Sequence, residues 1–117
     1  MTPKLHGSKS NDAPKLAEPL TLPCGATLPN RLAKAAMTEG LATADGIATD
    51  ALCRLYRTWA EGGAGLLITG NVIVDRDHLE RPGNVVIHGA PGEAQQAALA
   101  RWAAAATSAG TAAWVQL

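Results

Sequence analysis

The sequence has 117 residues, and its ten basic side chains balance ten acidic ones, so the formal net charge at pH 7 is zero. This is the length of one small domain with a modest core. No block of like charge stands out and no apolar run reaches the roughly 18–20 residues of a membrane span, which argues against nucleic-acid and membrane partners. Small molecules or other proteins are the expected partners.

The two cysteines and the amino-terminal stretch bear on the setting of the protein. Cys24 and Cys53 lie outside any C-x-x-C pattern, which suggests neither a disulfide framework nor a zinc site. We therefore expect a reducing, cytoplasmic environment. Residues 1–15 are polar and lack the apolar region of a signal peptide, so they are predicted to form a flexible tail before one folded unit at 16–117.

The first apolar segment, "PLTLPCGATLPNRL", carries a Pro-Cys-Gly turn signal and predicts a β-hairpin that leads into a third strand. The following "RLAKAAMTEG" is rich in helix formers. Helix propensity is a weak guide where tertiary contacts decide, and the preceding hairpin favours a strand over residues 32–37. A helix remains the alternative for this stretch.

A helix is predicted next, after the loop "TADGIATD", because the side-chain oxygen of Thr49 or Asp50 can cap its first turn. Apolar side chains recur at helical spacing on one face, namely Leu52, Leu55, Tyr56 and Trp59. Gly62-Gly63 should end the helix, because glycine adopts the left-handed conformation of a helix cap.

The second half of the sequence alternates strand and helix patterns. "GLLITGNVIVD" is apolar on both faces, as in a buried parallel strand, and "RPGNVVIHG" is expected to be an extended excursion between turns. Residues 92–109 predict a helix that ends at Gly110, followed by a strand in "TAAWVQL". The apolar stripe expected on this helix consists of Leu99, Trp102, Ala103 and Ala106. The order of hairpin, β, α, β, α, β is typical of α/β folds with a parallel sheet.

Ligands of parallel sheets and barrels bind at the carboxyl ends of the strands. In this sequence those ends are Met37-Thr38, Gly70 and Gln116-Leu117. The Thr38 hydroxyl and the Gln116 carboxamide can hydrogen bond to the carbonyls and ring nitrogens of a flat heterocycle. Gly70, which has no side chain, would let the ring approach the backbone closely. Each residue also has a structural interpretation, since Thr38 suits a turn, Gly70 a bend and Gln116 the cap of a loop.

Other signatures of catalysis are missing from the sequence. No G-x-G-x-x-G follows a predicted strand, and neither a P-loop nor an H-E-x-x-H motif occurs. The three histidines, His6, His78 and His88, are scattered over the tail and loops and are expected to be structural or exposed.

Three stretches together resemble the amino-terminal third of the Old Yellow Enzyme family of FMN-dependent NADH:flavin oxidoreductases: "LTLPCGATLPNRLAKAAMT", "DGIATDALCRLYRTWAEGGAGLLITGNVIVD" and "ARWAAAATSAGTAAWVQL". The resemblance runs from about Leu20 to Leu117. It implies a (β/α)8 TIM barrel with a hairpin over its amino-terminal mouth. A complete barrel takes about 250 residues, so the chain would supply only the hairpin, two strand–helix units and the third strand.

The resemblance also implies a cofactor and its contacts. The residues implied to bind FMN are Ala35, Ala36, Met37, Thr38, Gly70 and Gln116. The first three would run their backbone along the flavin, the Thr38 hydroxyl would bond its O4 edge, Gly70 would let the ring pass close and Gln116 would meet the pyrimidine edge. NADH or NADPH would reduce the flavin, which would pass hydride to an activated alkene or similar small molecule. No catalytic residue and no metal ligand is expected within the chain.

Substrate handling is left open by a departure from the family pattern. One branch has Cys in place of Thr38 and a substrate-contacting Tyr two positions later, where this sequence has Gly40. Two alternatives to an FMN oxidoreductase stand beside it. The chain is a truncated, non-catalytic polypeptide that cannot bind FMN alone, or it belongs to another TIM-barrel family, which would place a Lys or Glu at a strand end.

Overall fold

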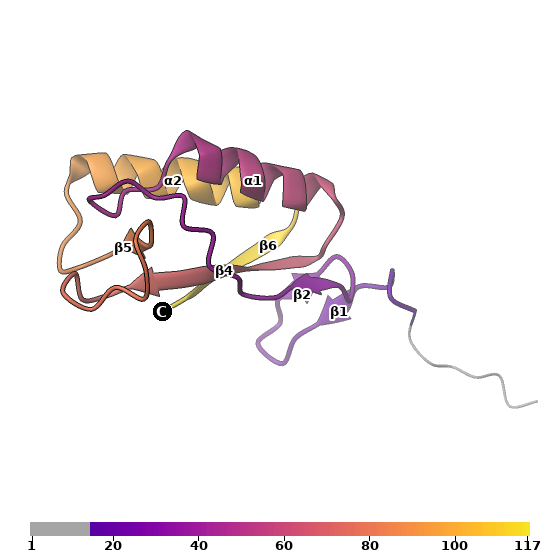
Figure 1. Ribbon diagram of the computed structural model, residues 1–117. Coiled ribbons are helices and arrows are strands. Elements are labelled where there is room, and N and C mark those ends of the chain that lie inside the picture. Colours follow the sequence, from indigo (N-terminus) through magenta and orange to yellow (C-terminus); the bar gives the residue numbers. More distant parts are fainter. Residues whose placement is uncertain (1–14) are drawn as a thin grey trace, which may run out of the picture.

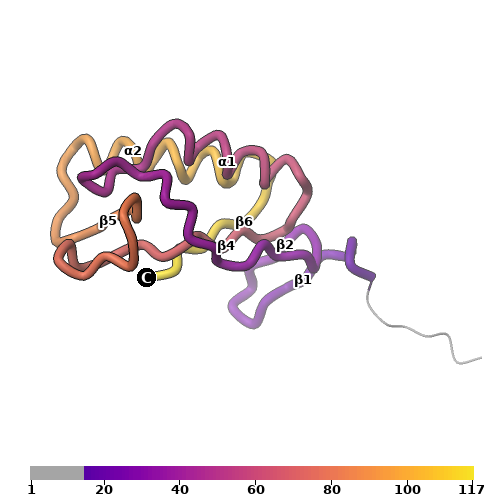
Figure 2. The backbone as a smooth tube through the Cα atoms, viewed as in Figure 1, coloured from indigo at the N-terminus to yellow at the C-terminus, as the bar shows by residue number. Residues whose placement is uncertain are grey.

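The computed structural model describes residues 15–117, so nearly all of the tail predicted at 1–15 lies outside the described residues. Two helices cover one face of a four-stranded sheet, and a separate two-stranded hairpin precedes them (Figure 1). The hairpin lies at the end of the sheet away from β5 (Figure 2). No helix within these residues is long and apolar enough to cross a membrane.

The predicted hairpin is confirmed. Strand β1 (Leu20–Thr21) pairs antiparallel with β2 (Thr27–Leu28), and Gly25 in the turn between them has a positive φ of 89°. The chain then enters β3 (Ala33–Lys34), which is parallel to β4. This strand spans only two of the residues predicted at 32–37, and the alternative of a helix there is wrong.

Helix α1 (Asp50–Glu61) begins and ends as predicted. The Thr49 hydroxyl oxygen accepts a hydrogen bond from the Leu52 amide at 3.3 Å, which satisfies one of the free amides of the first turn. Gly63, just past the end, has a φ of +95°, a conformation that glycine adopts without strain. Leu52 and Tyr56 turn the predicted apolar face into the core.

The sheet is built around β4 (Leu66–Ile73), which corresponds to the predicted buried strand. On its two sides β3 and β6 (Ala112–Gln116) run parallel to it, and β5 (Val85–Val86) adds a short parallel pairing. Strand β5 lies within the segment predicted only as an extended excursion. A ladder of two residues is too short to produce a recognisable periodic pattern.

Helix α2 (Glu93–Ala106) is shorter at both ends than the predicted 92–109. Its buried residues are Ala98, Trp102, Ala105 and Ala106. The stripe was therefore predicted correctly at Trp102 and Ala106 but not at Ala103, which is exposed. The buried face of α2 differs from the predicted stripe because the helix packs on α1 as well as on the sheet. Small alanine side chains allow the two helices to approach closely.

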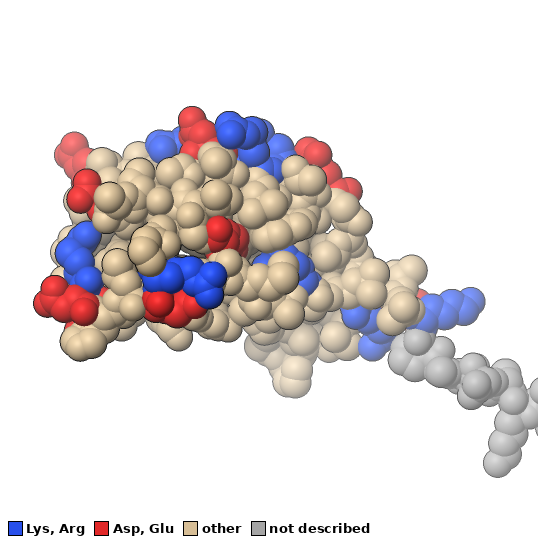
Figure 3. All heavy atoms as spheres, viewed as in Figure 1, with Lys and Arg blue, Asp and Glu red and all other residues tan. Residues whose placement is uncertain are grey.

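The core joins both helices to β4. Tyr56 is completely buried, and its ring meets the rings of Trp59 and Trp102 edge to face at centroid distances of 5.1 and 5.2 Å. Such pairs are favoured by the opposite charge distribution of ring edges and faces. At the surface, side chains of both charge signs are interspersed (Figure 3), as the balanced composition requires.

Candidate functional site

The residues between β3 and Glu39, hereafter the 35–38 segment, form the first part of the predicted site. Residues 36–39 take part in none of the loop or turn backbone hydrogen bonds of the described chain. At the start of the segment, the Lys34 ammonium donates to the Ala35 carbonyl at 2.8 Å. The same ammonium lies 4.5 Å from the ring centroid of Trp59, within the range of cation–π attraction.

Lys34 is thus partly withdrawn from water on the helix side of the sheet. Desolvation lowers the pKa of its ammonium, and the negative charge of Glu39 opposes this effect. A side chain held in this way restrains the beginning of the 35–38 segment against α1.

Glu39 holds the other end of the segment. Its carboxylate accepts a hydrogen bond from the Tyr56 hydroxyl and another, at 3.3 Å, from the Gly70 amide. Burial, and then the hydrogen bond to Glu39, raise the pKa of Tyr56 well above its ordinary value. The Tyr56 hydroxyl therefore stays a donor, and one carboxylate connects α1 to β4.

Gly70 lies inside β4, which continues to Ile73, and not at the carboxyl end of the strand as predicted. It is in close contact with another part of the chain. A Cβ atom at this position would be 2.4 Å from the Met37 carbonyl oxygen and 2.7 Å from both Thr38 Cα and a Glu39 carboxylate oxygen. The missing side chain therefore makes room for residues 37–39. The close approach of a flavin ring at Gly70 stays a prediction, and this packing gives the glycine a structural reason of its own.

Thr38 is already engaged within the chain. Its hydroxyl donates to a carboxylate oxygen of Glu80 at 2.9 Å, which leaves the hydroxyl oxygen free to accept. This hydrogen bond is the main cause that lowers the pKa of the exposed Glu80 carboxyl, with those from Asn84 and Arg81 contributing less. Donation to a flavin O4 would require the hydroxyl proton to turn away from Glu80.

Gln116 reaches the same region from β6. Its side-chain amide donates to the Asn71 side-chain oxygen, and its backbone amide donates to the Thr69 hydroxyl at 3.0 Å. The register of β4 and β6 shifts between Ile68 and Asn71, which sets Asn71 opposite Gln116. Asn71 was not among the predicted site residues, although its place directly after Gly70 was a signal that could have marked it.

Two groups of predicted residues therefore meet beside β4. Met37 and Thr38 pack on Gly70, and Gln116 contacts Asn71, the residue after Gly70. Ala35 and Met37 are exposed, Ala36 is half-buried, and the Trp114 side chain on β6 is 49% exposed. The candidate site is thus an exposed surface beside β4.

No family model matches the chain. It is 41% identical, over 100 residues, to an NADH-dependent flavin oxidoreductase of Hypocrea jecorina (strain QM6a), which covers 85% of this chain and 25% of that protein. A flavin oxidoreductase of Talaromyces variabilis, also named NADH-dependent, is 50% identical over 64 residues, or 55% of this chain and 16% of that protein. The Old Yellow Enzyme homologue of Zymomonas mobilis superimposes with a TM-score of 0.73 at 28% identity, over 89% of this chain and 28% of that one. By sequence and by fold, the chain matches part of the Old Yellow Enzymes.

This likeness to the Old Yellow Enzymes explains the architecture. The fold is part of a (β/α)8 barrel, as predicted, with β3, β4 and β6 as parallel barrel strands and α1 and α2 as outer helices. The chain spans about a quarter of the length of the Hypocrea jecorina relative. The prediction of another TIM-barrel family is wrong, because these relatives and structural neighbours are flavin oxidoreductases and Old Yellow Enzymes by name.

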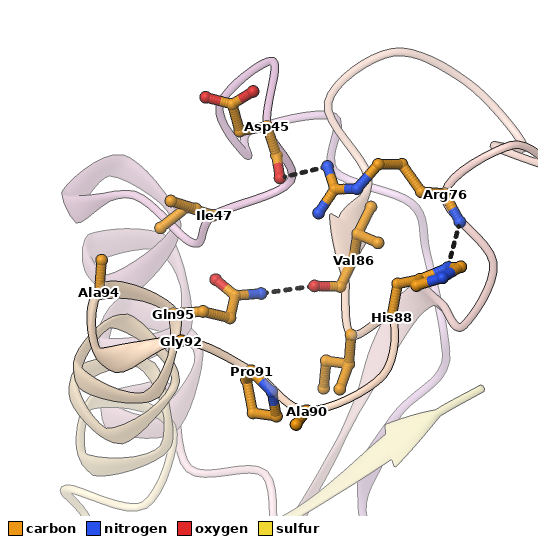
Figure 4. A pocket seen from close by; sticks show the side chains of 11 residues that line it. Asp45, Ile47, Arg76, Val86, His88, Ala90, Pro91, Gly92, Ala94 and Gln95 are labelled. Carbon is orange, nitrogen blue, oxygen red and sulfur yellow. Dashed lines mark hydrogen bonds between the residues drawn. The ribbon is translucent and has the colours of Figure 1, made fainter.

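A polar cavity of about 250 Å³ lies elsewhere in the chain, between β5 and the start of α2 (Figure 4). The Arg76 guanidinium donates to the Asp45 carbonyl at 2.9 Å, and the Gln95 amide donates to the Val86 carbonyl. His88, which is exposed as predicted, accepts from the Arg76 amide. These polar groups hold the surrounding loops together, which gives the cavity a structural role.

The contact between Thr38 and Glu80 predicts a pH effect. The pKa of Glu80 is lowered in the folded chain, so its carboxylate contributes to stability at neutral pH. This contribution is lost as the pH falls through the lowered pKa, which lies below the ordinary glutamate value of about 4.3. Thr38→Val keeps the shape and removes the donor, so the pKa of Glu80 should rise in an NMR titration of its carboxyl carbon. Thr58→Val, on α1, should leave it unchanged; an unaltered Glu80 pKa in Thr38→Val would show that this hydrogen bond does not form.

Proposed function

We propose that this chain forms the first part of the flavin site of an FMN-dependent oxidoreductase that takes electrons from NADH or NADPH. The observation that carries the proposal is the meeting of the 35–38 segment, Gly70 and Gln116 at one open edge of a partial Old Yellow Enzyme barrel. Two curated relatives are named NADH-dependent flavin oxidoreductases. The acceptor is a small molecule, such as an activated alkene, and the setting is cytoplasmic.

The side chains at this edge fit a flavin by their donor and acceptor groups. FMN, when bound, supplies the hydride transfer between nicotinamide and acceptor. The side-chain nitrogen of Gln116 donates to Asn71, and this contact orients the Gln116 carboxamide. The Gln116 side-chain oxygen can then accept a hydrogen bond from an N–H group of the pyrimidine ring. The Thr38 hydroxyl accepts, or donates at the cost of its bond to Glu80. The side chains at 35–37 are apolar, and two of them are small, so the ring can lie close to this backbone.

The residues of this edge bind and orient the cofactor, and none of them acts as an acid or base in the proposal. The surface is open on the side away from the helices, where Met37 is 52% exposed, and β6 pairs only with β4 among the described strands. We therefore propose that the 117-residue chain is inactive by itself and that FMN binding needs the rest of a barrel.

A chimeric barrel tests the proposal. Residues 20–117 replace the matched segment of the Hypocrea jecorina relative, and the purified chimera should contain FMN that NADH reduces. Gln116→Ala should raise the dissociation constant of FMN roughly five- to tenfold, the loss expected for one hydrogen bond. Gln96→Ala, an exposed carboxamide on α2, is the matched control and should have no effect. A chimera that folds without flavin, beside a yellow parent, would overturn the proposal.

A further inference from the structure

We propose that Glu39 is the positioning residue of the flavin site, acting on the 35–38 segment through the Tyr56 hydroxyl and the Gly70 amide. The inference rests on the proposed function, because that function assigns the segment to the flavin. Glu39 is not among the residues predicted to contact the flavin. It fixes the position of residues that are.

The first argument is that few other contacts restrain this segment, apart from the hydrogen bond of the Thr38 hydroxyl to Glu80. Strand β3 ends at Lys34, and its pairing with β4 extends only to Leu67. Beyond that pair, the backbone at 36–39 makes none of the loop or turn hydrogen bonds of the described chain. The side chains at 35–37 are two alanines and a methionine, which offer no strong hydrogen-bonding group. The position of the segment must therefore be set from its ends.

The second argument is the pair of elements that Glu39 joins. Gly70 lies three residues past the last β4 residue that pairs with β3, so its amide has no partner on that strand, and the Glu39 carboxylate supplies an acceptor. The same carboxylate accepts from the completely buried Tyr56 of α1. Because both contacts use one side chain, moving Glu39 would release residues 37 and 38 from β4.

The third argument comes from the close fit at Gly70. The Met37 carbonyl and Thr38 Cα lie where a side chain at Gly70 would otherwise be. Such a fit keeps its geometry only while something draws the segment toward β4. Hydrogen bonds to a charged acceptor are stronger than those between neutral groups, so the Glu39 carboxylate suits this task.

Amide hydrogen exchange of the 117-residue chain, without flavin, tests the inference. In Glu39→Ala, the Gly70 amide should exchange roughly tenfold faster or more, as expected for loss of a charge-assisted hydrogen bond, and the amide chemical shifts of residues 36–38 should change. The Leu67 amide in the paired part of β4 should keep its rate. Glu61→Ala, which removes an exposed carboxylate at the end of α1, is the matched control and should leave all these rates unchanged.

Conservative variants keep the test decisive if Glu39→Ala does not fold. Glu39→Gln retains an oxygen acceptor without the charge, so exchange at Gly70 should lie between the rates of the wild type and of the Ala variant. Tyr56→Phe keeps the ring and removes one donor to Glu39, and should also change the amide chemical shifts at 36–38. Unchanged exchange at Gly70, with unchanged chemical shifts at 36–38, in these variants would overturn the inference.

A spectroscopic signature separates positioning from a general loss of stability. Tyr56 is the only tyrosine of the chain, so the ultraviolet absorbance of phenolate reports its ionisation alone. In the wild type, phenolate should appear only when alkali unfolds the chain, because burial and Glu39 raise the pKa of Tyr56. In Glu39→Gln it should appear at lower pH than in the wild type; an unchanged titration curve would count against the contact.

The two proposals fail separately. If the chimera that carries wild-type residues 20–117 folds but contains no FMN, the proposed function is contradicted, whatever the exchange rates are. Wild-type exchange rates in the Glu39 variants contradict the role of Glu39, even if the chimera is yellow. If both proposals hold, the chimera with Glu39→Gln should bind FMN several-fold more weakly than the parent chimera. Adding the control substitution Gln96→Ala should not change that affinity.

Discussion

Replacing Gly70 by alanine should displace the 35–38 segment from β4 and lower the free energy of unfolding by about 1–3 kcal/mol, the usual cost of overpacking. The atoms that a Cβ would meet include the backbone of Met37 and Thr38, which cannot move aside as a flexible side chain would. Gly70 has no positive φ, so strain of the backbone does not contribute. Urea denaturation measures the change, and amide chemical shifts at 36–39 show where the chain moves.

Gly92→Ala is the matched control for this substitution. A Cβ at Gly92 would meet nothing within 4 Å, and the residue has a φ of −69°, which alanine adopts freely. Because Gly92 is the N-cap of α2, where alanine is less favourable than glycine, its effect should be up to about 1 kcal/mol, less than that of Gly70→Ala. Equal stability of the two variants would contradict the close packing of residues 37–39 on β4.

Truncating the Tyr56 side chain should have the largest effect on stability. Tyr56→Ala removes a completely buried ring that contacts Trp59 and Trp102, and such a cavity costs about 3–5 kcal/mol. Domains of this size are stable by only about 5–15 kcal/mol. The variant should therefore be largely destabilised, as measured by the midpoint of urea unfolding at an unchanged slope.

Tyr56→Phe separates the ring from the hydroxyl. The ring contacts remain, while the Glu39 carboxylate loses one donor, so the cost should be about 1–3 kcal/mol. A variant as unstable as Tyr56→Ala would mean that the hydroxyl, and not the packing, accounts for the effect. A variant as stable as the wild type would mean that the contact with Glu39 contributes nothing.

The parts of the fold that sequence reasoning predicted are those fixed by local signals. Thr49 caps α1 and Gly63 ends it because caps depend on the residues beside the helix. The apolar run of β4 marks a strand buried on both faces. By contrast, β3 is short because only two of its residues reach β4, and β5 exists because Val85 meets Val72; neither partner can be read from the local sequence.

The candidate site shows the same division. Strand ends indicated Met37, Thr38, Gly70 and Gln116, and the structure brings them together in two contacting groups. The partners of these residues come from distant parts of the chain. Glu80 lies 42 residues from Thr38, and Gly70 lies 31 residues from Glu39. Reasoning from the sequence therefore named residues that lie near one another, but missed Glu39, Asn71 and Glu80, which contact them.

A crystal structure of the FMN-loaded chimera tests the central claim most directly. The account predicts that the flavin ring lies against the backbone of residues 35–37 and that the Gln116 side chain hydrogen bonds to the pyrimidine edge. It further predicts that Glu39 keeps its bonds to Tyr56 and Gly70 beneath that segment. A flavin bound elsewhere, with Gln116 and residues 35–37 out of contact with it, would contradict the account.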